Sequence, residues 1–290
     1  MVVEAAPAKI NIALHVVGRR PDRYHELESL VVFADLGDEL EAEPASADRL
    51  SISGPFAAGL GVGETNLVSR AVVEFRRHWP GAVATGLDMR LRKNLPIAAG
   101  LGGGSADAAA TLRLMARVAD RPIPVPALLE VAASLGADVP MCLICRPSVV
   151  TGIGERVAPL ADFPPVHVVL VNPLVPVLTA DIFRRLENRQ NPVLPLLPSP
   201  LTRPAQLGLW LEGTRNDLEP PARSLVPAIA ELIEHLAGLN GCMLARMSGS
   251  GATVFGLFGA SGLAHQAAHD LRDAYPGYWV AAAPLLGVEG

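Results

Sequence analysis

The sequence is poor in charged residues, in cysteine and in long hydrophobic runs. Of its 290 residues, 18% are charged and 50% are hydrophobic, so we expect a large core and exclude a disordered chain. Lys and Arg number 24 against 29 Asp and Glu. The sequence therefore lacks the basic footprint of a general nucleic-acid-binding protein, although a local nucleotide site is compatible with this balance.

Cysteine occurs three times, an odd number that builds no disulfide framework, and we therefore expect a reducing compartment, the cytoplasm. Cys142 and Cys145 have CxxC spacing, but no second pair accompanies them. We interpret them as structural thiols in an apolar strand at 141–145. The N-terminus has no basic region and predicts a strand rather than a signal peptide. The most apolar stretch, 166–178, is short and interrupted by prolines, so we expect no membrane-spanning helix.

Alternating apolar residues predict half-buried strands at 8–17 and 87–92. On one side of the first strand Lys9 and Asn11 lie two residues apart, and taken alone they indicate a solvated face. The other elements expected in the first half are short strands at 30–33, 39–43 and 50–53, helices at 66–78 and 126–135, and a hairpin at 149–151 and 156–160.

The second half begins after a proline-containing segment at 161–165 that we interpret as a linker between domains 1–162 and 163–290. Its expected order is strand, helix, helix, strand, strand, helix, strand, which contains a βαββαβ series. These elements are predicted at 166–172, 180–186, 227–237, 242–247, 253–258, 263–274 and 278–283, with an irregular proline-rich stretch at 191–204.

A glycine-rich segment, NLPIAAGLGGGSADAAAT at 94–111, joins a predicted strand to a predicted helix. We expect Ser105 to cap that helix and Asp107 to suit the positive end of its dipole. Such a corner binds anions through free N–H groups, although a tight turn without a ligand has the same composition. The GxxxxGK[ST] and GxGxxG patterns are both absent, which separates this loop from two common nucleotide-binding loops.

Five segments together resemble the GHMP kinases, namely PAKINIALHVVGRRPDRYHEL, PIAAGLGGGSADAA, GADVP, RNDLEP and MSGSGATVFGLF. The resemblance implies an α+β fold of two domains, the first like the second domain of ribosomal protein S5 and the second ferredoxin-like. It also implies a small-molecule kinase that transfers the γ-phosphate of ATP to an alcohol with the help of Mg²⁺. No metal ligand is assigned.

The same resemblance assigns the parts of the active site. Lys9 and Asp138 would be catalytic, with Asp138 accepting the proton of the attacking hydroxyl and Lys9 stabilising negative charge. Ser105 would cap the helix or face the metal and phosphates. The family often has a second serine where this chain has Ala106. The expected ATP-binding residues are Pro96, Ile97, Ala98, Ala99, Gly100, Leu101, Gly102, Gly103, Gly104, Ser105 and Ala106.

The branch of the family that the segments match best acts on a cytidyl-bearing alcohol in the non-mevalonate isoprenoid pathway. Tyr24 would stack on cytosine, His25 would read its edge, and Phe183 would cover the opposite face. The family usually has glycine where this chain has Arg23. The remaining residues expected to bind the substrate are Asn11, Gly249 and Ser250.

Two alternatives remain open from the sequence. A GHMP kinase could act on mevalonate-type, homoserine or sugar alcohols, but Tyr24 and His25 would then have no base to bind. A catalytically idle nucleotide- or RNA-binding module is disfavoured by the acidic balance and by Lys9 and Asp138. We expect a small-molecule partner, no nucleic acid and no membrane, while a monomer and a homodimer are both compatible with the sequence.

Overall fold

The computed structural model describes residues 1–22 and 24–288 of the chain. They form two compact units, each assembled from separated segments. Unit 1 consists of Met1–Ala8, Leu36–Leu95 and Gly102–Cys145, and unit 2 of Lys9–Asp35, Pro96–Leu101 and the chain from Arg146 onward. The linker at 161–165 between domains 1–162 and 163–290 stays a prediction. Within residues 1–22 and 24–288, no helix is both long and apolar enough to cross a bilayer.

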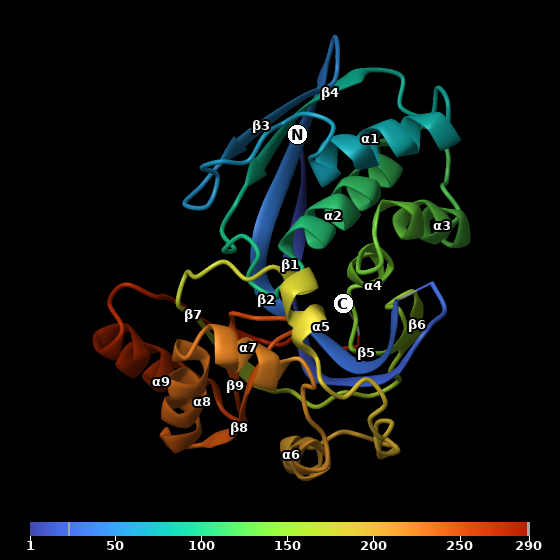
Figure 1. Ribbon diagram of the computed structural model, residues 1–290. Coiled ribbons are helices and arrows are strands. Elements are labelled where there is room, and N and C mark those ends of the chain that lie inside the picture. Colours follow the sequence, from blue (N-terminus) through green and yellow to red (C-terminus); the bar gives the residue numbers. More distant parts are fainter. Residues whose placement is uncertain (23, 289–290) are drawn as a thin grey trace. The chain divides into compact units, whose positions relative to one another are not determined.

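Two long strands supply residues to both units (Figure 1). β1 (Val2–Arg19) pairs with β2 (His25–Ala45), and β2 continues a six-stranded sheet in the order β3-β4-β2-β5-β6. β3 (Arg49–Ser53) and β4 (Gly86–Arg92) extend the sheet beside residues 39–45 of β2. The separate strands predicted at 30–33 and 39–43 are therefore parts of one strand, because residues 34–38 between them also have extended backbone and belong to β2.

Unit 1 adds four helices: α1 (Leu67–His78), α2 (Gly103–Val118), α3 (Val125–Leu135) and α4 (Val139–Ile144). Asn66 caps α1 by accepting a hydrogen bond from the Val68 N–H at 2.9 Å. The strand predicted at 141–145 is wrong, because this apolar run forms α4. Pro140 suits the first turn of a helix, and Cys145 ends it in the left-handed conformation. A short apolar run buried on every side carries no periodicity that could distinguish the two structures.

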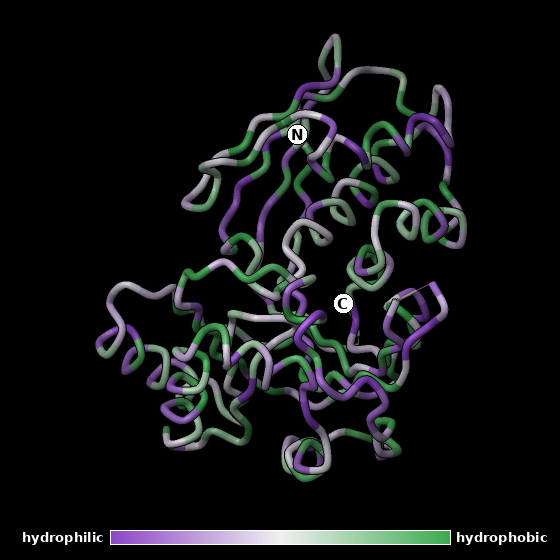
Figure 2. Tube along the Cα trace, in the orientation of Figure 1, coloured by the Kyte–Doolittle hydropathy of each residue, from purple (hydrophilic) through white to green (hydrophobic). Residues whose placement is uncertain are grey.

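In unit 2 the second half of the chain forms a four-stranded antiparallel sheet in the order β10-β7-β9-β8. The predicted βαββαβ series is confirmed, with α8 (Ala228–Gly238) and α9 (Ser261–Ala274) packed against one hydrophobic core with the sheet. Hydrophilic and hydrophobic residues both occur along each of these helices, as expected for amphipathic helices (Figure 2). The strands are β7 (His167–Asn172), β8 (Cys242–Met247), β9 (Val254–Phe258) and β10 (Trp279–Pro284).

Three further helices and a hairpin complete unit 2. β5 (Ser148–Gly152) and β6 (Arg156–Pro159) form the predicted hairpin, and α5 (Thr179–Arg185) the predicted helix. α6 (Pro204–Glu212) and α7 (Glu219–Leu225) were not predicted. Both helices carry proline in the first turn, where it is tolerated. Proline usually indicates irregular structure, but in these two segments it lies at the start of a helix.

Candidate active site

The glycine loop, defined as residues 96–106, has the backbone of an anion-binding corner. Ala98, Gly100 and Gly102 have φ values of 52°, 75° and 65°, and α2 begins at Gly103. The cap of α2 is the left-handed Gly102, so the prediction that Ser105 caps the helix is wrong: Ser105 lies inside its first turn. The N–H groups of that turn have no partner within the helix and suit phosphate oxygens.

A buried charged cluster, which we call the loop foot, underlies this corner in unit 1. The Lys93 ammonium donates to the carboxylates of Asp38 and Asp107, the latter at 2.6 Å. The other Asp38 oxygen accepts the N–H groups of Asn94 and Leu95 at 2.6 and 2.9 Å. Asp38 and Lys93 therefore fix the chain where it enters the loop, and Asp107 joins them to the first two turns of α2.

The loop foot carries two carboxylates against one ammonium, and all three side chains are buried. Burial raises the pKa of Asp107 to about 7, because desolvation outweighs the attraction of Lys93 and Asp38 adds repulsion. Asp107 is held in the loop foot by Lys93, and with its raised pKa it binds a proton more readily than an exposed aspartate. Its role at the helix dipole stays a prediction.

In unit 2 the first half of the glycine loop is tied to β1 and to the serine turn, residues 248–251. The Lys9 N–H donates to the Leu101 carbonyl at 2.9 Å, and the Ser248 hydroxyl donates to the Gly100 carbonyl at 3.0 Å. A Cβ on Gly100 would lie 2.4 Å from the Ser248 carbonyl oxygen. Glycine at position 100 therefore permits both the positive φ and the close backbone approach.

Lys9 and Asn11 are buried, each with 5% of its surface exposed, so a solvated face of β1 is excluded. The Lys9 ammonium donates to the Asn11 side-chain carbonyl at 2.8 Å, and the Asn11 amide donates to the Ser29 hydroxyl at 2.8 Å. The Asn11 N–H also donates to the Ser248 hydroxyl at 3.2 Å. Both predicted β1 residues thus lie in one network with the serine turn.

The serine turn is supported by Asn216, to which the sequence analysis assigned no role. Its side-chain amide donates to the carbonyls of Met247 and Gly249, each at 2.8 Å. A Cβ on Gly249 would lie 3.0 Å from the Gly100 carbonyl oxygen, so this glycine also permits close packing against the loop. The Ser250 hydroxyl contacts the Thr179 hydroxyl at 2.8 Å at the start of α5. RNDLEP was the available signal for Asn216.

Asp138, in unit 1, is half-buried and directly precedes α4. The segment GADVP therefore leads into a helix, whereas the sequence analysis expected a strand after it. Ala106 lies buried within α2. The catalytic roles of Asp138 and Lys9 stay predictions.

The residues expected to bind the base lie at the start of β2 and on α5. The His25 and Phe183 rings stack with centroids 4.8 Å apart and planes 20° apart, so the structure brings these two together. Tyr24 is 61% exposed. One face of the Phe183 ring is therefore covered by the His25 ring. Arg23 lies outside the described residues, and the base-binding roles stay predictions.

Burial lowers the pKa of His25, and the nearby charges of Arg19 and Arg189 lower it further. A neutral imidazole has one nitrogen that donates and one that accepts. Its buried Nε2 has no hydrogen-bond partner among the described residues. The ring can therefore serve a polar ligand.

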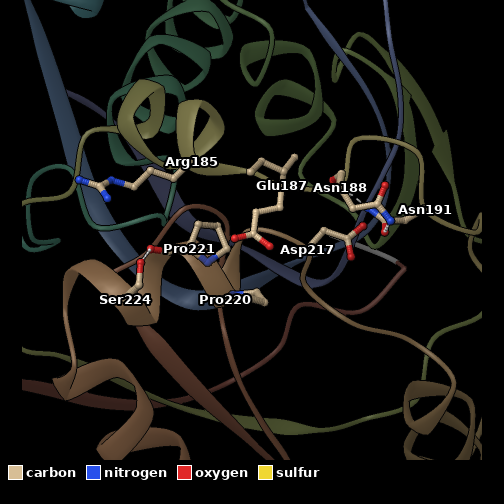
Figure 3. Close-up of a pocket in the computed structure, with 9 residues that line it drawn as sticks. Arg185, Glu187, Asn188, Asn191, Asp217, Pro220, Pro221 and Ser224 are labelled. Carbon is tan, nitrogen blue, oxygen red and sulfur yellow. Dashed lines mark hydrogen bonds between the residues drawn. The ribbon is translucent and has the colours of Figure 1, made fainter.

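A cavity of about 330 Å³ lies in unit 2 beside the end of α5 (Figure 3). Its lining combines Arg185 and Glu187 with Asp217 and the first residues of α7. None of the residues predicted to bind ATP or the base lines it, and we assign it no ligand.

The CxxC pair consists of a buried Cys142 and a half-buried Cys145. Within the described part of the chain, no group of three or more His, Cys, Asp and Glu could hold a metal.

Comparison with known proteins gives matches along nearly the whole chain. The family model "GHMP kinases N terminal domain" matches residues 66–146, and "GHMP kinases C terminal" matches residues 201–277. The 4-diphosphocytidyl-2-C-methyl-D-erythritol kinase of Dinoroseobacter shibae is 48% identical over 276 residues, covering 95% of this chain and 92% of the relative. The enzyme of the same name from Agrobacterium fabrum is 48% identical over 284 residues, covering 96% and 94%.

Solved structures give the same result. A crystal structure of 4-(cytidine 5′-diphospho)-2C-methyl-D-erythritol kinase matches with a TM-score of 0.79 and 34% identity, covering 98% of this chain and 99% of that one. The homoserine kinase of Cytophaga hutchinsonii matches with a TM-score of 0.69 at 18% identity, covering 97% and 93%. This second likeness shows a shared fold alone.

Proposed function

The chain belongs to the GHMP kinase family, and on that premise we propose the reaction that it catalyses: ATP-dependent phosphorylation of the 2-hydroxyl of 4-diphosphocytidyl-2-C-methyl-D-erythritol. The reaction belongs to the non-mevalonate isoprenoid pathway. The observation that carries the proposal is 48% identity to kinases of this name over 95% of the chain. We place the enzyme in the cytoplasm, as the sequence predicts.

The glycine loop holds the triphosphate of ATP in this proposal. Backbone N–H groups at the start of α2 face the phosphates, and the helix dipole adds attraction for negative charge. The positive φ of Gly100 and Gly102 and the absence of a Cβ support close approach by a phosphate group.

Asp138 accepts the proton of the substrate hydroxyl or orients that hydroxyl, and Lys9 stabilises the negative charge that develops on the transferred phosphoryl group. Phosphoryl transfer needs little covalent chemistry from the protein, so positioning and charge stabilisation dominate. The hydrogen bond from Lys9 to Asn11 supports a fixed position for the ammonium.

Mg²⁺ accompanies ATP in this proposal. It prefers oxygen ligands, retains several waters and is commonly held by phosphates with one or two carboxylates. The lack of a larger acidic cluster among residues 1–22 and 24–288 fits an ion carried mainly by the nucleotide. Bound there, Mg²⁺ would neutralise phosphate charge.

ADP release with the cytidyl substrate, compared with mevalonate and homoserine, tests the proposal. We expect turnover with the cytidyl substrate only. A uridyl analogue should be poor, because its edge exchanges the donor and acceptor groups that His25 would face. Equal use of cytidyl and uridyl substrates would move the enzyme to another branch of the family.

Asp138→Asn tests the mechanism separately from the substrate. The variant should lose about 10²–10⁴-fold in kcat, the range for one positioned acid–base group, while ATP still binds. Near-wild-type kcat would remove Asp138 from the mechanism.

A further inference from the structure

The segment that begins at Phe183, which we call the strap (residues 183–194), contacts the hairpin of β1 and β2 at several points within unit 2. Phe183 stacks on His25 at one end, and the Leu194 N–H donates to the Glu28 carboxylate at 2.8 Å at the other. Between them Asn191 donates twice to the Val16 carbonyl, from its N–H at 3.0 Å and its side chain at 3.1 Å.

Arg189 lies in the middle of the strap, in a turn whose shape is fixed by its neighbours. The side-chain oxygen of Asn188 accepts a hydrogen bond from the Gln190 N–H at 3.1 Å. The side-chain amide of Asn188 donates to the side-chain oxygen of Asn191 at 2.7 Å. Asn188 and Asn191 lie against each other in Figure 3. The turn therefore holds Arg189 in place without using the Arg189 side chain.

The Arg189 guanidinium has an unused donor inside the protein. Its Nε is buried and has no hydrogen-bond partner among the described residues, and the same is true of His25 Nε2. Arg189 is close enough to His25 to act on its charge state. Arg189 and His25 thus each bury a nitrogen without a partner among the described residues, which is costly unless a ligand satisfies it.

We propose that Arg189 is a specificity-determining residue that donates a hydrogen bond to an acceptor oxygen of the substrate's cytidyl diphosphate group. The inference rests on the proposed function, because it takes the cytidyl substrate from there. A guanidinium has donors and no acceptor, and its planar fork suits a phosphate or a base carbonyl oxygen. His25 and Arg189 would then face the same ligand from β2 and from the strap.

Calorimetric titration with cytidine 5′-diphosphate, cytidine and ADP tests this assignment. Arg189→Gln should weaken cytidine 5′-diphosphate by about 10- to 100-fold and leave ADP unchanged, since one charge-assisted hydrogen bond is lost. Loss with cytidine as well identifies the base carbonyl, and loss with the diphosphate alone identifies a phosphate oxygen.

Arg184→Gln is the matched control. Arg184 lies on α5, is 75% exposed at its side chain and pairs with Asp181 at 2.9 Å, so the control removes the same charge from the surface. It should bind all three ligands as the wild type does. Arg189→Lys keeps the charge without the fork and should recover part of the affinity, which a loss of folding would not allow.

The outcomes separate the two proposals. If the wild type phosphorylates the cytidyl substrate and Arg189→Gln binds cytidine 5′-diphosphate within about twofold of the wild type, this inference is overturned and the proposed function stands. If the wild type neither binds cytidine 5′-diphosphate nor phosphorylates the cytidyl substrate, both are overturned.

Discussion

The loop foot in unit 1 and the strap in unit 2 each hold a cationic side chain, Lys93 and Arg189, but the two have different hydrogen-bond partners. Lys93 donates to two carboxylates, and Asp38 also accepts two backbone N–H groups. Arg189 leaves its Nε without a partner in the described chain, as does His25 its Nε2. The loop foot also leaves one atom, Asp107 Oδ1, without a partner among the described residues, but its ammonium is paired within the protein. The unpartnered donor of Arg189 has no such acceptor among these residues, so the strap gains more stability when a ligand supplies one.

The largest effect should come from removing the cation of the loop foot. Lys93→Ala leaves two carboxylates buried together and should lower the free energy of unfolding by about 3–5 kcal/mol. Arg90→Ala, which removes an exposed pair with Glu43, should cost less than about 1 kcal/mol. Urea unfolding measures both, and similar losses would show that the loop foot contributes no more than a surface pair.

Gly100→Ala tests the packing of the glycine loop against the serine turn. An alanine at φ 75° costs about 1–2 kcal/mol, and its Cβ would clash with the Ser248 carbonyl, so the KM for ATP should rise by about 10-fold or more. Gly81→Ala has the same φ class, 74°, with nothing within 4 Å of a Cβ. It should lower stability without changing the KM, and a shared KM effect would contradict the assignment of the loop.

Tyr24→Leu sharpens the comparison at the base-binding corner. Loss of a stacking ring should cost about 1–3 kcal/mol, expressed in the KM for the cytidyl substrate rather than in kcat, because the base is bound alike in ground and transition states. The KM for ATP should not change. Tyr278→Leu, a ring stacked on Tyr275 instead, is the control. An effect on ATP alone would place Tyr24 elsewhere.

The smallest effect at neutral pH should come from Asp107→Asn, which keeps the shape of the side chain without its charge. Because the folded pKa of about 7 lies above the usual 3.8, the folded state binds more protons between these values. Wild-type stability should therefore fall as pH rises from 3.8 to about 7. The variant should show a flatter profile. An unchanged slope would mean that Asp107 is not the group that binds the proton.

Much of the fold could be predicted from the sequence. The α+β fold of GHMP kinases and the use of ATP, both implied by the resemblance, are confirmed. The βαββαβ series could be predicted from the residues themselves, because its hydrophobic patterns are local. The helix α4 could not be distinguished from a strand, since five of its six residues are buried and its short apolar run shows no periodicity. The helices α6 and α7 were not predicted because their first turns contain proline, which usually indicates irregular structure.

The site was predicted less evenly. Lys9, Asn11 and Gly100 could be singled out as candidates because they lie in recognisable segments, and the structure places Lys9 and Asn11 in one hydrogen-bond network while their roles stay predictions. Lys93 and Asp38 were missed because they are 55 residues apart in sequence and only the fold brings them together. Arg189 stands in no quoted segment, and its unpartnered nitrogen becomes visible only when the strap is in place.

The assembly of unit 2 from segments far apart in the sequence has a consequence for folding during biosynthesis. This unit takes Lys9–Asp35 from the beginning of the chain and β10 from its end, and β10 pairs with β7. The ribosome must therefore have released the chain through Pro284 before unit 2 can close its sheet and core. A fragment beginning at residue 163 would lack the strands that hold the strap and should aggregate, and the early strands are candidates for chaperone binding during translation.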